Sequence, residues 1–307
     1  MWFWLSLLAL LCWSGSDLFS KIGCGNRDDR LGHLKMVMAV GLVMGVHAAF
    51  EIFSQNVPIS WQILVTYLPV SLLYILSMTL GYLGLRYIEL SVSSPICNAS
   101  GAVVAVLCIA TGTLDESITG TMRILVFAAV ALVCIGVIGL GVVESREDED
   151  LRQQRRQSTN FRYTKSWLAL FLPLAYCLLD AAGTFADSLV LQTLDEDSAN
   201  VAYELTFFAA GCVSAVYVLI FKRERLKFAT EGPKLMGAVF ETAGQLAYIY
   251  ALADSAHVAL SAPIISSYCA VSVLWGRLFL KEKLSWKHYV MILLVMIGIV
   301  MLGIFDI

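Results

Sequence analysis

The segment YLGLRYIELSVSSPI, residues Tyr82–Ile96, is echoed in the second half of the chain by YALADSAHVALSAPI, residues Tyr250–Ile264. The two segments align without a gap, and Pro95 falls on Pro263. Further along, LDESIT at residues 114–119 aligns with LKEKLS at residues 280–285 after a two-residue slip. Weak internal symmetry of this kind predicts two structurally related halves.

The chain around these segments is strongly apolar. Of its 307 residues, 59% are hydrophobic and 15% are charged, and its mean hydropathy is +0.76. A soluble domain of this length needs more charge to cover its surface. The apolar residues come in blocks of roughly 20, the length of a membrane-spanning helix. We place ten such helices at residues 2–22, 32–53, 62–85, 88–111, 122–143, 167–190, 198–221, 234–253, 257–280 and 287–305.

A long charged segment divides these helices into two groups of five. We therefore predict a first five-helix repeat at residues 1–143, a charged linker at 144–166 and a second five-helix repeat at 167–307. Because five crossings are an odd number, the second repeat must have the opposite orientation in the membrane. The expected fold class is all-α integral membrane, with ten transmembrane helices in a 5+5 inverted-topology repeat.

Lysine and arginine lie almost entirely in alternate loops. The breaks after the first, third, fifth, seventh and ninth predicted helices hold 20 of the 21 basic residues, and Arg123 is the exception. The opposite loops are neutral or acidic. Since short basic loops stay in the cytoplasm, we expect a multi-pass protein of the cell membrane with both termini outside.

Polar side chains within the predicted helices are the candidates for a functional site, because an ionisable group at the bilayer centre costs at least ~2.5–3.5 kcal/mol. Asp180, Thr184 and Asp187 recur at helical spacing and therefore share one face. Glu241, Gln245 and Tyr248 form a second stripe of the same spacing. The candidates for binding a substrate or a coupling ion are Glu241, Asp180, Gln245, Thr184, Tyr74, Tyr248, Asn98, Ser266, Ser267 and Trp13.

No Lys or Arg lies near the middle of a predicted helix to balance Asp180 or Glu241. Either acid could therefore carry a coupling proton, or the cavity could prefer a cationic or amine-bearing solute. The structural alternative is a neutral acid that hydrogen-bonds a neighbouring helix. Asp17, Glu51 and Glu204 lie nearer the helix ends, and we expect them to face solvent.

Pro95 and Pro263 interrupt corresponding helices of the two halves. Paired interruptions point to the substrate site of repeat-built transporters, whereas kinks that serve packing alone are the alternative. The sequence has no G-x-x-x-x-G-K-[ST] loop, no H-E-x-x-H and no C-x-x-C pair. We therefore expect no ATP-driven transport, no enzyme activity, no cofactor and no metal site, and no nucleic-acid partner.

Three stretches resemble the EamA-type members of the drug/metabolite transporter superfamily. They are LALLCWSGSDLFSK at residues 8–21, SAPI at 261–264 with the later GRLFLKEKLSWKHYVMILLVMIGIVMLGI at 276–304, and the weaker copy in the first half. The acidic residue of the family's L-x-E-x-L-[ST] turn matches Glu116 and Glu282. The resemblance implies a 5+5 inverted repeat around a central cavity and transport of small metabolites by alternating access. It also implies cytoplasmic termini, opposite to the orientation that the loop charges predict.

The expected function is secondary transport of a small metabolite, of the amino-acid, amine, sugar or nucleoside class. The expected partners are this small-molecule substrate, the lipid bilayer and a coupling proton or cation, and the chain is expected to act as a monomer or dimer. A membrane-embedded enzyme and a non-transporting receptor are the alternatives. An enzyme needs a catalytic cluster near an interface, and a receptor has little use for paired prolines in a repeat.

Overall fold

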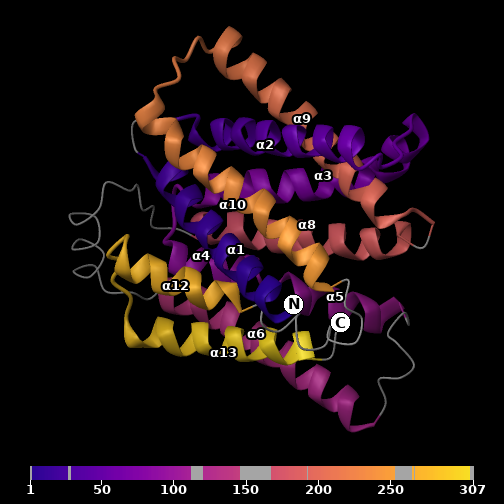
Figure 1. Cartoon of the computed structure of the whole chain (residues 1–307). Coiled ribbons are helices and arrows are strands. Elements are labelled where there is room, and N and C mark those ends of the chain that lie inside the picture. The colour runs from indigo at the N-terminus through magenta and orange to yellow at the C-terminus, as the bar shows by residue number, and fades with distance from the viewer. Residues whose placement is uncertain are drawn as a thin grey trace.

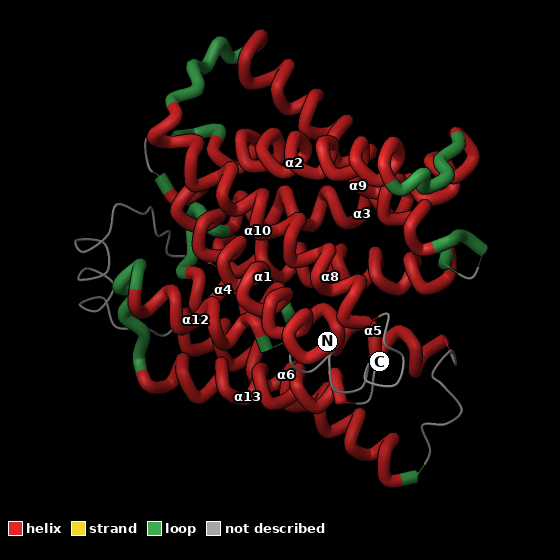
Figure 2. The backbone as a smooth tube through the Cα atoms, in the orientation of Figure 1, coloured by secondary structure: helices red, strands yellow, loops and turns green. Residues whose placement is uncertain are grey.

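The structure, a computed structural model, describes residues 2–26, 29–111, 120–145, 167–191, 193–252, 265 and 267–304. Over these residues it consists of helices and their connecting loops, with no strand (Figure 2). The helices of the first half are α1 (Trp2–Gly25), α2 (Gly32–Ser54), α3 (Trp61–Gly84), α4 (Leu90–Cys97), α5 (Ser100–Thr111) and α6 (Thr121–Ser145). Those of the second half are α8 (Trp167–Val190), α9 (Glu196–Ala215), the π-helical η1 (Val216–Phe221), α10 (Phe228–Leu252), α12 (Tyr268–Leu278) and α13 (Trp286–Ile304).

Each of the ten predicted ranges contains described helix, so the predicted helix positions are confirmed over these residues. Six described helices are long and apolar enough to cross a membrane. These are Phe3–Gly25, Gly32–Ser54, Trp61–Gly84, Thr121–Leu140, Ala169–Asp187 and Glu196–Phe221, and Leu90–Val104 and Trp286–Met301 are shorter apolar helices. Large apolar side chains such as Ile138 and Ile220 are exposed on the outside of the bundle, as lipid contact requires.

The fourth predicted helix is interrupted. Pro95 lies inside α4, which ends two residues later at Cys97, and α5 begins at Ser100. A proline removes the hydrogen bond to the carbonyl four residues before it and crowds that turn, so the direct effect of Pro95 falls on residues 91–94, whereas the break lies after it at residues 98–99. Pro263 lies outside the described residues.

The helices pack in four close pairs. α1 lies along α10, α3 along α8, α2 along α9, and α6 along α13. In Figure 1, α2 and α9 form one edge of the bundle, α6 and α13 form the other, and α1 and α10 cross the space between them. Each pair joins a helix of the first half to one of the second, so both halves build the centre of the bundle.

Glycine allows a close approach between α2 and α9. A Cβ atom on Gly41 of α2 would lie 2.7 Å from the carbonyl oxygen of Phe207 and 2.9 Å from the Cα atom of Gly211 on α9. Any side chain at Gly41 would therefore push the two backbones apart, as expected of small residues where membrane helices cross closely.

Candidate functional site

A cavity of about 700 Å³ occupies the middle of the bundle. At one end its lining reaches Leu85 and Leu90, beside the loops 29–31, 85–89 and 279–285, and we call this the basic end. At the opposite end the lining reaches Glu196, an exposed residue in the first turn of α9. The volume is that of a site for a small molecule.

The cavity brings together most of the residues singled out in the sequence. Both predicted stripes face it, and Asp187 completes the stripe on α8. The predicted residues that line it are Trp13, Tyr74, Asn98, Asp180, Thr184, Glu241, Gln245 and Tyr248. Ser267 precedes α12 as its N-cap and is not among the lining residues, and Pro95 is buried inside α4. Ser266 and Pro263 lie outside the described residues.

The expectation that Asp17 faces solvent is wrong. Asp17 lines the cavity, and its Oδ2 atom accepts hydrogen bonds of 2.6 Å from the hydroxyls of Ser94 and Ser272. These serines belong to α4 and α12, so the carboxylate of Asp17 joins three helices that are far apart in the sequence. Helical spacing within α1 alone does not show which other helices face Asp17.

The expectation for Glu204 is also wrong. This side chain is 1% exposed, and its Oε1 atom lies 2.9 Å from Nδ1 of His47. Nε2 of the same histidine lies 3.6 Å from Oε1 of Glu51. The three side chains connect α2 with α9 and do not line the cavity, so they form a separate interhelical cluster.

The cavity is acidic. Its lining contains the carboxylates of Asp17, Asp180, Asp187, Glu196 and Glu241, and among the described lining residues there is no Lys, Arg or His. Hydroxyl groups solvate these acids. Ser16 Oγ donates to Glu241 Oε2 at 2.7 Å, and Tyr67 Oη donates to Asp187 Oδ1 at 2.7 Å. Because no described cation faces these acids, the cavity is suited to a positive charge.

Aromatic rings form much of the remaining wall. The ring centroid of Trp13 lies 5.2 Å from that of Tyr248 and 5.7 Å from that of Tyr268. Gly244 makes room for the indole, because a Cβ atom there would lie 2.5 Å from Cδ1 of Trp13. The indole N–H of Trp13 and the hydroxyl of Tyr82 have no hydrogen-bond partner among the described residues, although both atoms are buried.

Several lining residues were missed in the sequence, among them Tyr82, Tyr176 and Tyr203. A tyrosine in an apolar segment is a weak signal, since tyrosine also favours the membrane interfaces. Ser16 and Ser20 on α1 share a helical face, and this spacing is the signal that could have added α1 to the site.

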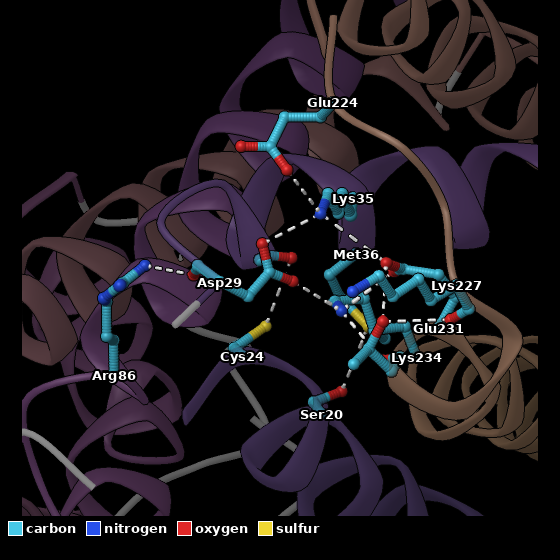
Figure 3. A network of polar contacts seen from close by, with 12 residues as sticks. Ser20, Cys24, Asp29, Lys35, Met36, Arg86, Glu224, Lys227, Glu231 and Lys234 are labelled. Carbon is cyan, nitrogen blue, oxygen red and sulfur yellow. Dashed lines mark hydrogen bonds and ion pairs between the residues drawn. The ribbon is translucent and has the colours of Figure 1, made fainter. Parts of the chain in front are cut away.

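A network of ion pairs closes the basic end of the bundle (Figure 3). The Asp29 carboxylate bridges two lysines, with Oδ1 at 3.0 Å from Lys35 Nζ and Oδ2 at 2.9 Å from Lys234 Nζ. Arg86 Nη1 donates to the backbone oxygen of Asp29 at 2.6 Å. Glu231 also contacts both lysines, at 3.6 and 2.9 Å. Burial raises the pKa of Asp29, but the two ammonium groups outweigh burial and leave this pKa below its ordinary value.

A second set of contacts at this end holds the turn between α3 and α4. The fully buried Lys21 donates from Nζ to the backbone oxygens of Leu85 and Ile88, at 2.6 and 2.5 Å. The Glu282 carboxylate accepts from the backbone N–H groups of Leu90 and Ser91, at 2.8 and 3.0 Å. An acid at a helix N-terminus is favoured by the unpaired N–H groups and by the helix dipole.

We call these contacts the basic-end lock. Its members are Lys21, Asp29, Lys35, Arg86, Lys234 and Glu282, and all six are buried. In the sequence, the four basic members served only as indicators of orientation. The structure adds that two second-half members bind groups of the first half: Lys234 pairs with Asp29, and Glu282 accepts the backbone N–H groups at the start of α4.

The helices and the cavity define a multi-pass helical membrane protein. A comparison with known families matches residues 167–304 to the EamA-like transporter family, which belongs to the drug/metabolite transporter superfamily. The match covers the second half of the chain, and the resemblance expected from the sequence is confirmed there. A comparison with curated proteins gave no significant match.

Proposed function

We propose that this protein is a secondary transporter that moves a small solute through the central cavity by alternating access. One observation carries the proposal: the cavity reaches the exposed Glu196 at one end and stops at the basic-end lock at the other. Alternating access requires a central site that opens to one side at a time. The match of residues 167–304 to a transporter family supports the same class of function.

The packing of the helices supports a 5+5 inverted repeat, with repeats at residues 1–143 and 167–307 and a linker at 144–166. In the proposed repeats α1 is equivalent to α8, and α3 is equivalent to α10. The α1–α10 pair therefore corresponds to the α8–α3 pair, and both pairs are closely packed. The same equivalence maps the α2–α9 pair and the α6–α13 pair onto themselves. Such an arrangement lets one scaffold adopt two equivalent states, each open to a different side.

The basic-end lock is the proposed inner gate. Because short basic loops are retained in the cytoplasm, the locked end faces the cytoplasm and the cavity is accessible from outside in this state. Both termini then lie outside the cell membrane. This orientation is opposite to the one that the family resemblance implies.

Glu241 and Asp180 are the proposed coupling acids. Both line the cavity, and each has a hydroxyl partner, Ser16 for Glu241 and Ser100 for Asp180. A serine hydroxyl can donate to a carboxylate and accept from a carboxylic acid, so it serves either protonation state. This adaptability suits an acid that gains and loses a proton during transport.

The test is solute-dependent flux in proteoliposomes that contain the purified chain and an internal pH indicator. Pooled metabolites are added under an imposed proton gradient, with Glu241→Gln and Asp180→Asn in parallel and Glu51→Gln as the control carboxylate outside the cavity. We expect solute-dependent proton movement that one or both cavity variants abolish. Solute movement without a pH change would support transport and contradict proton coupling. No movement with any pool would contradict the proposed transport function.

A further inference from the structure

We infer that the solute of the central cavity is an organic ammonium ion with an apolar body that packs against aromatic rings. The inference rests on the proposed transport function and narrows its substrate class.

The first support is the charge of the lining. Five carboxylates, those of Asp17, Asp180, Asp187, Glu196 and Glu241, face one cavity, and no described lining residue is basic. Electrostatic interactions are strong in a low-dielectric interior, so a solute that bears a carboxylate or a phosphate is repelled. The described polar partners of Asp17 and Glu241 are serine hydroxyls, which leave the negative charge uncompensated when the acids are ionised.

The second support is the spread of these acids along the cavity. Among the described residues there is no group of three or more His, Cys, Asp or Glu side chains that could hold a metal ion. On α8, Asp180 and Asp187 are seven residues apart, which corresponds to roughly 10 Å along a helix. Separate carboxylates across a cavity of about 700 Å³ suit the ammonium group of an organic molecule better than a compact inorganic cation.

The third support is independent of the acids. Tyr82 is 6% exposed, lines the cavity and has a hydroxyl with no partner among the described residues. A buried hydroxyl without a partner is costly, and its oxygen can accept an N–H from an ammonium group when the Tyr82 side chain turns toward the cavity. The aromatic rings of Trp13, Tyr248 and Tyr268, which line the same cavity, can hold an apolar body and attract a cation over their faces.

The test compares three compounds that share a phenyl ring and a two-carbon chain but differ in charge. Phenethylamine is positive at pH 7, phenethyl alcohol is neutral and 3-phenylpropionate is negative. Binding to the whole chain in detergent micelles is measured by calorimetry, so it does not depend on transport. We expect phenethylamine to bind at least about tenfold more tightly than the other two, which corresponds to ~1.4 kcal/mol.

Variants identify the groups responsible. Asp17→Asn and Glu241→Gln should each lower the affinity for phenethylamine at least about tenfold. Glu51→Gln, on α2 outside the cavity, should leave this affinity unchanged. Tyr82→Phe should lower the affinity for phenethylamine. It should not lower thermal stability, because the Tyr82 hydroxyl has no described protein partner to lose. Tyr87→Phe, outside the cavity lining, is the matched control.

The charge series needs no variant, so a variant that fails to fold does not decide the result. Equal binding of the three compounds, or tighter binding of 3-phenylpropionate, would overturn the cation assignment. Flux of neutral or anionic metabolites in proteoliposomes, together with no amine binding, would support the transport function and contradict the organic-ammonium substrate class. Amine binding without flux of any solute would instead support the cation site and contradict transport.

Discussion

Glu282, in the loop between α12 and α13, accepts the backbone N–H of Leu90 at 2.8 Å and so caps the first turn of α4. An acid of the second half thereby secures a helix of the first half. The contact lies at the end of the cavity that stops at Leu85 and Leu90. Separation of the two halves at the basic end must break the Glu282–Leu90 hydrogen bond, so a variant that lacks this bond tests the proposed gate.

Replacement of Glu282 by Gln should loosen the basic end. A glutamine side chain has one acceptor oxygen, so at least one of the donors now served by the carboxylate loses its partner, at a cost of about 1–3 kcal/mol. Cys24, which is 1% exposed beside Gly32, is a native reporter of this opening. In a chain that keeps Cys24 as its sole cysteine, we expect Glu282→Gln to speed maleimide labelling about tenfold.

The matched control for this experiment is Glu116→Gln, at the equivalent position of the repeated L-x-E-x-L-[ST] turn. Glu116 lies outside the described residues. The predicted inverted repeat puts its turn on the opposite side of the membrane from Glu282, so Cys24 labelling should stay at the wild-type rate. Equal acceleration by both variants, or by neither, would show that Glu282 does not hold the basic end closed.

Asp29→Asn should destabilise the folded chain, because Lys35 and Lys234 lose the carboxylate that bridges them. Removal of one partner from a buried ion pair costs about 3–5 kcal/mol, and Glu231 retains contacts with both lysines, so we expect the lower end of this range. Thermal unfolding in detergent measures the change. Glu224→Gln, which removes a more exposed partner of Lys35, is the control and should cost about 1 kcal/mol or less.

The same residue sets a pH dependence. The pKa of Asp29 is lower in the folded chain than its ordinary value of 3.8. Its stabilising effect is therefore complete above pH 3.8 and is lost as the pH falls through the folded-state pKa. We expect the stability difference between wild type and Asp29→Asn to stay constant from pH 8 to 5 and to shrink in stronger acid. A difference that vanishes already between pH 7 and 5 would contradict the bridged carboxylate.

Gly244→Ala should disturb the cavity wall. The new methyl group would lie 2.5 Å from Cδ1 of Trp13, so the indole must move, and overpacking of this kind costs about 1–3 kcal/mol. We expect weaker phenethylamine binding by calorimetry and a lower unfolding temperature. Gly232→Ala, in the same helix with nothing within 4 Å of the added atom, should leave binding intact. Unchanged phenethylamine binding in both variants would show that the placement of the Trp13 indole does not matter for amine binding.

The sequence predicted the positions of the helices because blocks of about 20 apolar residues leave few other arrangements. It also predicted the two polar stripes, since Asp180–Asp187 and Glu241–Tyr248 each lie on one helix with a fixed period. The place of Asp17 could not be predicted in this way, because its partners Ser94 and Ser272 belong to helices whose packing the sequence does not reveal. The basic-end lock was missed for the same reason: Asp29, Lys35 and Lys234 meet only after α2 and α10 have packed.

A comparison of access at the two ends of the cavity tests alternating access most directly. Two single-cysteine chains are compared in detergent, one with Cys24 at the basic end and one with Asn200→Cys, which lines the cavity near the opposite end. Maleimide labelling is followed in wild-type background and with Glu282→Gln. Alternating access predicts that Glu282→Gln speeds labelling of Cys24 and slows labelling at position 200. Faster labelling at both positions, or no change at either, would contradict alternating access through this cavity.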